Sequence, residues 1–191
     1  MSKTKPLKMN IKDKISSVFQ VETREQAANR LHVTADKNLV SSILLYLKTQ
    51  LGYIHLNHIS CVDWIEKNQF ELVYIVWNPQ TKKTVLVHTF IDREQPEMEN
   101  IDTIWDQAHT YEREMREMYG IEFPGLVAPK EFILEDWSGM PPMRRDFDTK
   151  KYAQETYSTR PGRENARDVR EELMKRSGEE LPDFAKKYSR D

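Results

Sequence analysis

The run of hydrophobic residues from Phe70 to Trp77 constrains the fold more than any other part of the chain. It is nearly uninterrupted, which is typical of a strand that is covered on both faces of its sheet. Turn residues follow at positions 78–83, and a second β-prone run extends from Thr84 to Ile91. Because the connection is short, the two runs are expected to form an antiparallel hairpin. The sequence therefore predicts a sheet built around this hairpin.

Helical periodicity elsewhere in the sequence predicts helices that would cover the sheet. Apolar residues recur at intervals of three and four over residues 39–51, between a candidate N-cap at Asp36 and a glycine at position 52. A second stripe predicts a helix that begins near residue 100 or 102 and ends at Gly120. Its charged residues are spaced to pair one turn apart.

The remaining patterned segments are shorter. Residues 11–19 fit a short amphipathic helix, and residues 30–34 and 53–62 fit strands. We therefore expect an α+β fold: a small sheet of about four strands, mixed or antiparallel, with a central hairpin, packed by helices and followed by an extended C-terminal tail.

Composition divides the chain into four parts. Only 38% of the residues are hydrophobic, and residues 150–191 carry 11 basic and 9 acidic side chains with scattered apolar ones. Such a tail has too little apolar surface for a core of its own, so we expect it to wrap around a larger partner. The predicted parts are an N-terminal segment with a short helix (1–27), an α+β core (28–123), an extended Gly/Pro-rich segment (124–149) and the charged tail (150–191).

Charge and cysteine content argue against several classes of protein. The 29 basic and 31 acidic residues leave a net charge of −2, without the basic excess typical of nucleic-acid binders. The apolar runs fall short of the about 20 residues that a membrane-spanning helix needs. The single Cys61 excludes an internal disulfide and an all-cysteine metal site. No secretory signal is visible at the N-terminus, so we expect a cytoplasmic protein.

Two clusters of polar side chains are candidates for metal binding or acid–base catalysis. The first cluster has the spacing of a metal-binding motif and consists of His55, His58 and Cys61. On a strand, however, the two histidines are expected to point to opposite faces, which disfavours binding of a shared metal ion. Glu112, Glu114 and Glu117 are interspersed with Arg113 and Arg116. Because each acid has a basic neighbour one turn away, we expect ionised carboxylates on a charged helix face, which becomes an interface network if the helix docks on a partner.

The stretch from Asp136 to Phe147 points to an interface. Glycine and a proline pair enforce an extended path that cannot satisfy its own backbone hydrogen bonds. Aromatic, methionine and arginine side chains are the types enriched at interface cores. The alternative is that the stretch packs back onto the sheet of the same chain. The candidate interface residues here are Asp136, Trp137, Met140, Met143, Arg144, Arg145, Asp146 and Phe147.

These two blocks resemble a known family. The first reads Tyr-Glu-Arg-Glu-Met-Arg-Glu-Met-Tyr-Gly from position 111 to 120, and the second contains Asp136-Trp137, Gly139 and Arg144-Arg145-Asp146-Phe147. Both are similar to the signature of the 30-kDa-type subunit of respiratory complex I, which related membrane-bound hydrogenase-type complexes also contain. The resemblance covers roughly residues 28–150.

The resemblance implies a non-catalytic role with no cofactor in this chain. Family members lie in the cytoplasmic arm, on the cytoplasmic side of the membrane. They contact the large subunit that is related to nickel–iron hydrogenases and lie near the small subunit that carries an iron–sulfur cluster. Departures from the family pattern, such as Leu126-Val127 after Gly125 and Pro142-Met143 in place of Pro-Leu, favour a divergent branch linked to ferredoxin, sulfur or hydrogen.

Two other functions stay open at this point. An independent soluble enzyme would use Glu112, Glu117 and Asp136 as acid–base groups, and would need a cavity holding a carboxylate with a raised pKa. A nucleic-acid binder would use the tail arginines, although acids are interleaved with them. These arginines are Arg160, Arg163, Arg167 and Arg170.

Overall fold

The computed structural model describes residues 10–126 and 131–156. The chain divides into one compact unit that ends at Phe147 and a second that begins at Asp148. The described part of the second unit contains a helix, α4 (Thr149–Thr156). Most of the predicted tail, including the four arginines named for nucleic-acid binding, lies outside the described residues.

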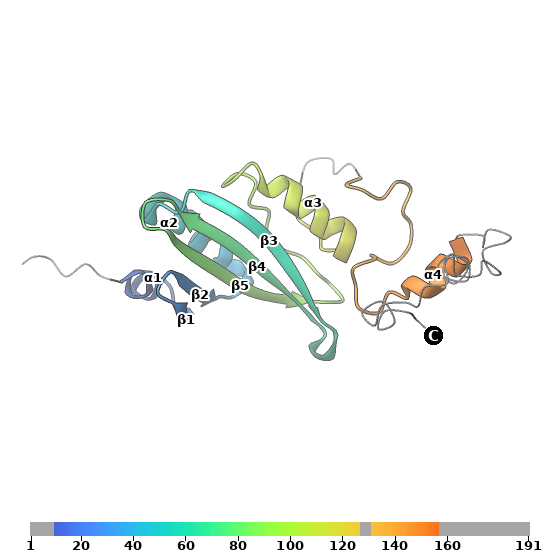
Figure 1. The fold of residues 1–191 in the computed structure, drawn as a ribbon, viewed down its shortest axis with the longest axis horizontal. Coiled ribbons are helices and arrows are strands. Elements are labelled where there is room, and N and C mark those ends of the chain that lie inside the picture. The colour runs from blue at the N-terminus through green and yellow to red at the C-terminus, as the bar shows by residue number, and fades with distance from the viewer. Residues whose placement is uncertain (1–9, 127–130, 157–191) are drawn as a thin grey trace, which may run out of the picture. The chain divides into compact units, whose positions relative to one another are not determined.

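The first unit contains one five-stranded sheet, with the strand order β1-β2-β5-β4-β3 (Figure 1). Neighbouring strands are antiparallel except for β2 and β5, which are parallel. The α+β class and the central β4–β5 hairpin are therefore confirmed, with five strands in place of about four. The strands are β1 (Glu22–Ala27), β2 (Arg30–Thr34), β3 (His55–Trp64), β4 (Gln69–Asn78) and β5 (Lys83–Asp92).

Strand β1 is the strand that the sequence did not predict. Its residues, Glu-Thr-Arg-Glu-Gln-Ala, have no hydrophobic alternation, and all but Thr23 are exposed. It pairs only with β2, at the edge of the sheet. Charged side chains are a common feature of edge strands because they discourage pairing with other chains.

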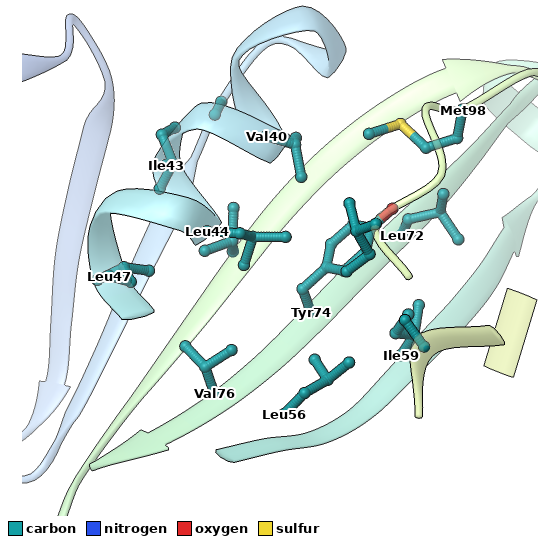
Figure 2. Close-up of a cluster of buried hydrophobic side chains, with 14 of the residues drawn as sticks. Val40, Ile43, Leu44, Leu47, Leu56, Ile59, Leu72, Tyr74, Val76 and Met98 are labelled. Carbon is teal, nitrogen blue, oxygen red and sulfur yellow. The ribbon is translucent and has the colours of Figure 1, made fainter. Parts of the chain in front are cut away.

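The core lies between the sheet and helix α2 (Val40–Leu51). As predicted, Asp36 acts as a cap, here for the short 3₁₀ turn Lys37–Leu39 (η1) that leads into α2, and the helix ends at Gly52 with φ 73°. Figure 2 shows Leu44 and Leu47 of α2 facing Tyr74 and Val76 of β4. Each fully buried leucine contributes about 2 kcal/mol to stability. Helix α1 (Ile11–Val18) adds Ile15 to the same cluster.

Helix α3 runs from Ala108 to Tyr119, so the predicted start near residue 100 or 102 is wrong. The preceding residues have helical spacing but form turns. Asn100 accepts a hydrogen bond from the backbone N–H of Asp102, and the backbone N–H of Ile101 is bound by the side chain of Glu112. Ile101 and Trp105 are buried nevertheless, which explains the misleading apolar stripe.

Burial along the central strands shows that one face of the sheet is covered. On β5, Val85 and Val87 are fully buried, whereas Leu86 is half-buried and Phe90 is 39% exposed. Every residue of β4 itself is buried or half-buried, so among the described residues the second face is open chiefly beside β4, at β3 and β5. Buried residues of α2 and α3 join the same core cluster, which lies on one face of the β3–β4–β5 strands.

Side chains on and just before α3 close the free edge of β3. Trp105, Tyr111 and Tyr119 donate hydrogen bonds to backbone carbonyls of residues 54, 57 and 61, at 2.9, 2.9 and 3.4 Å. Gln107 donates to the carbonyl of Leu56 in the same way. Carbonyls engaged in this way are not available to an added strand, so docking by strand addition is disfavoured at this edge.

Candidate partner interface

The segment of residues 131–147 follows α3 and carries most of the predicted interface residues. Its first attachment to the core is Glu117 on α3. The two carboxylate oxygens accept hydrogen bonds from the backbone N–H groups of Phe132, Ile133 and Leu134, at 2.5–3.0 Å. Burial acts to raise the pKa of Glu117, but these three donors outweigh it and hold the pKa below its usual value. One ionised side chain thus fixes three consecutive peptide groups.

The second attachment is the C-terminal end of α3. The carbonyl of Met118 accepts from the backbone N–H of Met143 at 3.0 Å, and that of Tyr119 accepts from Nε of Arg144 at 2.7 Å. Arginine at this position also complements the negative end of the helix. Gly120, with φ 76°, allows the close approach, because a Cβ there would lie 3.0 Å from the side chain of Pro141.

The third attachment is a buried ion network. Arg93, which follows β5, binds both oxygens of Asp63 at 2.8 and 3.1 Å and also contacts Asp146 at 2.5 Å. Asp63 also accepts the backbone N–H of Arg145 at 2.9 Å, and the Arg145 side chain pairs with Glu66 in the short turn η2 (Ile65–Lys67). The network therefore joins the ends of β3 and β5 to the segment.

The electrostatics of this network favour the charged forms. Burial acts to raise the pKa of Asp63, yet the hydrogen bonds from Arg93 and Arg145 lower it below its usual value. The hydrogen bond from Arg93 also lowers the pKa of Asp146. The two carboxylates in turn raise the pKa of Arg93. Asp63 and Arg93 are each less than 10% exposed, so removal of either would leave a buried charge without its partner.

The attached segment leaves large apolar side chains in solvent. Ile133, Met140 and Met143 are 67%, 46% and 56% exposed. Trp137 lies against Phe147, with ring centroids 5.8 Å apart, and its indole N–H donates to the carbonyls of Gly139 and Met140 at 3.1 Å. The segment consists of turns and bends, so the predicted extended path is wrong for residues 131–147. It is fixed at three places and presents apolar groups outward.

The predicted residues divide into two groups. Arg144, Arg145 and Asp146 bind this chain's own core, whereas Met140 and Met143 face solvent. Asp136 is exposed and its backbone N–H donates to Glu131, and Arg113 donates to the carbonyl of Glu131 at 2.6 Å.

Glu112 corrects the expectation of a charged helix face. It is fully buried, and its Oε1 accepts from the backbone N–H of Ile101 at 2.8 Å. Within residues 10–126 and 131–156, Oε2 has no hydrogen-bond partner. Burial raises the pKa of Glu112 to about 7, with a smaller contribution from the charge of Asp102. The prediction of an ordinary ionised carboxylate is therefore wrong for this residue.

The enzyme alternative required a raised-pKa carboxylate in a cavity. A cavity of about 270 Å³ does lie beside the segment, lined by Arg113, Arg116, Glu117, Glu122, Glu131, Leu134, Trp137, Gly139 and Pro141. Glu112 does not line it. Glu117 does, but backbone donors occupy both of its oxygens and lower its pKa. The three carboxylates do not form the acid–base set that this alternative predicted.

The histidine run also differs from its prediction. An irregularity between Leu56 and His58 shifts the register of β3 against β4, so His55 and His58 lie opposite Trp77 and Ile75 on the same face. Each histidine contacts an aromatic ring, and Cys61 is buried on the other face. Across residues 10–126 and 131–156, no group of three or more His, Cys, Asp or Glu side chains is arranged to hold a metal ion.

Sequence reasoning missed Asp63 and Arg93 as functional residues. A signal was present, because Ile59, Cys61 and Asp63 alternate along one strand and therefore share its buried face. An acid on such a face needs a cation or several donors. The sequence did not show which of the 29 basic residues would supply it.

Comparison with known proteins identifies the family. Residues 33–153 match the family described as the 30-kDa subunit of respiratory-chain NADH dehydrogenase. The chain belongs to this family. It is 30% identical over 120 residues to the C subunit of F420H2 dehydrogenase from Methanosarcina mazei, which covers 62% of this chain and 76% of that protein. It is also 30% identical over 117 residues to the C subunit of NADH-quinone oxidoreductase from Moorella thermoacetica, covering 61% and 78%.

Comparison with solved structures supports the same family. A chain of the membrane-bound sulfane sulfur reductase, an archaeal respiratory membrane complex, is similar with a TM-score of 0.70 and 27% identity, over 77% of this chain and 88% of that one. A trypsin-resistant fragment of Nqo5, at 18% identity and a TM-score of 0.53, shares the fold. The homologues of this chain are therefore subunits of multi-subunit respiratory complexes. The described helices include none with the length and apolar character to cross a membrane.

Proposed function

We propose that this chain is a non-catalytic structural and assembly subunit of the cytoplasmic arm of a membrane-bound, ion-translocating oxidoreductase complex. It docks on the hydrogenase-like large subunit through segment 131–147. The observation that carries the proposal is that some residues of this segment bind the chain's own core while others face solvent. Arg144, Arg145 and Asp146 bind the chain's own core. Ile133, Met140 and Met143 remain exposed.

Fused relatives support the choice of partner. A fused C/D subunit of NADH-quinone oxidoreductase from Aquifex aeolicus is 27% identical to this chain over 113 residues, which span 58% of this chain and 19% of that protein. Its name joins the C and D subunits in one polypeptide. A covalent link of this kind favours two parts that lie next to each other in the assembled complex.

In this proposal, the partner subunits carry out electron transfer and this chain does not. The iron–sulfur clusters are carried by the small subunit of the same complex, and this chain holds the large subunit in a fixed pose. The complex is of the NADH:quinone type or of the ferredoxin-linked hydrogenase or sulfur-reductase type. The chain reaches the cytoplasmic side of the membrane as a peripheral component, through its partners.

The test is assembly with the co-expressed large and small subunits. The double variant Met140→Glu/Met143→Glu places two charges on the exposed surface of the segment, and we expect at least a tenfold loss of co-purifying large subunit. The matched control is Leu45→Glu, because Leu45 on α2 is 49% exposed and distant in sequence from the segment. Equal recovery of the large subunit with the double variant and the control contradicts the proposed docking.

A further inference from the structure

The face of the sheet opposite the helices carries an apolar patch of its own. Register places Val62 of β3, Glu71 of β4 and Phe90 of β5 in one row across three strands. Trp64 lies in the next row on the same face, opposite Gln69 and directly before the turn η2 that joins β3 to β4. Val62, Trp64 and Phe90 are 39%, 36% and 39% exposed, although they are large hydrophobic residues. We call these three residues the open-face patch.

Trp64, the largest residue of the open-face patch, is held in place by polar contacts. The indole N–H of Trp64 donates to Glu71 at 2.7 Å, and the second oxygen of Glu71 lies 2.8 Å from Nδ1 of His88. The ammonium group of Lys67 lies 5.1 Å from the centre of the Trp64 ring. Side chains ordered in advance lose little conformational entropy when a partner binds, so this patch is prepared for an interface.

The sequence of β4 points to the same conclusion. Val73, Ile75 and Trp77 also lie on the open face, where Val73 is 8% exposed and the other two are half-buried. Leu72 and Tyr74 face the core. Strands that are apolar on both sides are typical of sheets covered on both faces. On the second face the described residues leave the three residues of the open-face patch exposed, and another polypeptide would cover this part of the sheet.

The charge around the open-face patch defines that cover. Glu66, Asp92 and Glu94 are exposed at the same end of the sheet. The exposed cations there are Lys67 and Arg145, and Arg145 already binds Glu66. With Glu66 and Arg145 paired, Asp92 and Glu94 remain against Lys67, so the rim has a net charge of −1. A second copy of this chain related by twofold symmetry would bring this negative charge against itself. A surface with an apolar centre and a rim of lysine or arginine complements it.

We propose that the open-face patch is a second docking surface, and that its occupant is a neighbouring subunit of the same complex with an apolar centre and a basic rim. The inference rests on the proposed function, because it requires that the chain works inside an assembly. It adds a surface on the opposite face of the sheet from α2. Closure of the β3 edge by residues on and before α3 disfavours strand addition on that side of the patch.

The test is photo-cross-linking in the assembled complex. Benzoylphenylalanine replaces Phe90 in one sample, Met140 in a second and Leu45 in a third. We expect the probe at position 90 to form an adduct with another subunit, on a peptide that contains apolar and basic residues. The probe at position 140 tests the proposed function independently, and the probe at position 45 is the negative control.

The possible outcomes separate the two proposals. An adduct at position 140 without one at 90 overturns the open-face inference and leaves the proposed function standing. An adduct at 90 with a second copy of this chain, or with its own residues 157–191, also overturns the inference. An adduct with another subunit at 90 but none at 140 supports the open-face patch and contradicts docking through segment 131–147. Absence of adducts at both positions contradicts both proposals.

Discussion

The core of the sheet and segment 131–147 are held together by different forces. Between α2 and β4 the contacts are apolar, with Leu44, Leu47 and Tyr74 fully buried or nearly so. The segment is held by Glu117, Arg144 and the Asp63–Arg93–Asp146 network. Apolar burial depends little on pH or salt, whereas charged contacts depend on both. We therefore expect that the fold and the attachment of segment 131–147 can be disrupted separately.

The largest loss of stability is expected for the buried ion network, where segment 131–147 meets the core of the sheet. Arg93→Ala leaves Asp63 buried without its cation, and breaking a buried ion pair in this way costs about 3–5 kcal/mol. We expect that loss in the free energy of unfolding, measured with urea at pH 7. The matched control is Arg116→Ala, which removes an exposed pair with Glu122 and should cost less than about 1 kcal/mol. Similar losses for both variants would contradict a central role for the buried network.

Disruption of the core should act on the whole chain and not on the segment in particular. Leu44→Ala removes a fully buried side chain and is expected to cost about 2–5 kcal/mol. Because the contact is apolar, this loss should be nearly the same in low salt and in about 0.5 M salt. A loss that shrinks strongly with salt would show that charge, not packing, stabilises this region.

Glu112 provides a pH test of the core. Its folded pKa of about 7 is raised above the ordinary value of about 4.5 by burial. The folded state therefore binds more protons than the unfolded state between these values, and stability falls as pH rises through this window, by roughly 3 kcal/mol. Glu112→Gln keeps an acceptor for the Ile101 N–H and removes the titration.

The measurement is the difference in unfolding free energy between wild type and Glu112→Gln at several pH values, from about 4.5 to about 8. We expect the variant to become progressively more stable relative to wild type as pH rises. Taking the difference cancels the opposite pH dependence of Asp63, Asp146 and Glu117, whose lowered pKa values stabilise the fold above about pH 4. Two parallel curves would contradict a raised pKa for Glu112.

The smallest effect is expected for one attachment of the segment. Glu117→Gln weakens the hydrogen bonds to the backbone N–H groups of residues 132–134, at a local cost of about 1–2 kcal/mol. Hydrogen exchange at these amides should become roughly tenfold faster, while amides of β4 keep their rates. Equal acceleration in β4 would mean that the segment and the core open as one unit.

The sequence predicted the parts of the fold that follow from apolar periodicity. The β4–β5 hairpin, the helix ending at Gly52 and the α+β class are confirmed. Strand β1 was missed because it has no apolar pattern, and the start of α3 was misplaced because Ile101 and Trp105 have helical spacing but are buried in turns.

The site was less predictable for a physical reason. The sequence pointed to segment 131–147, but not to the division between residues that hold it and residues that face outward. That division depends on contacts between positions far apart in the chain, such as Asp63 with Arg93 and Arg145. The burial of Glu112 likewise depends on the loop of residues 98–105, which no helical pattern reveals.

The central claim is that segment 131–147 is a preformed docking surface. Hydrogen exchange, measured on the isolated chain and on the chain in its assembled complex, tests it most directly. We predict that amides within residues 131–147 exchange at least tenfold more slowly in the complex, while those of the exposed edge strand β1 keep their rates. Unchanged exchange throughout residues 131–147 in a complex that still contains the chain would contradict the claim.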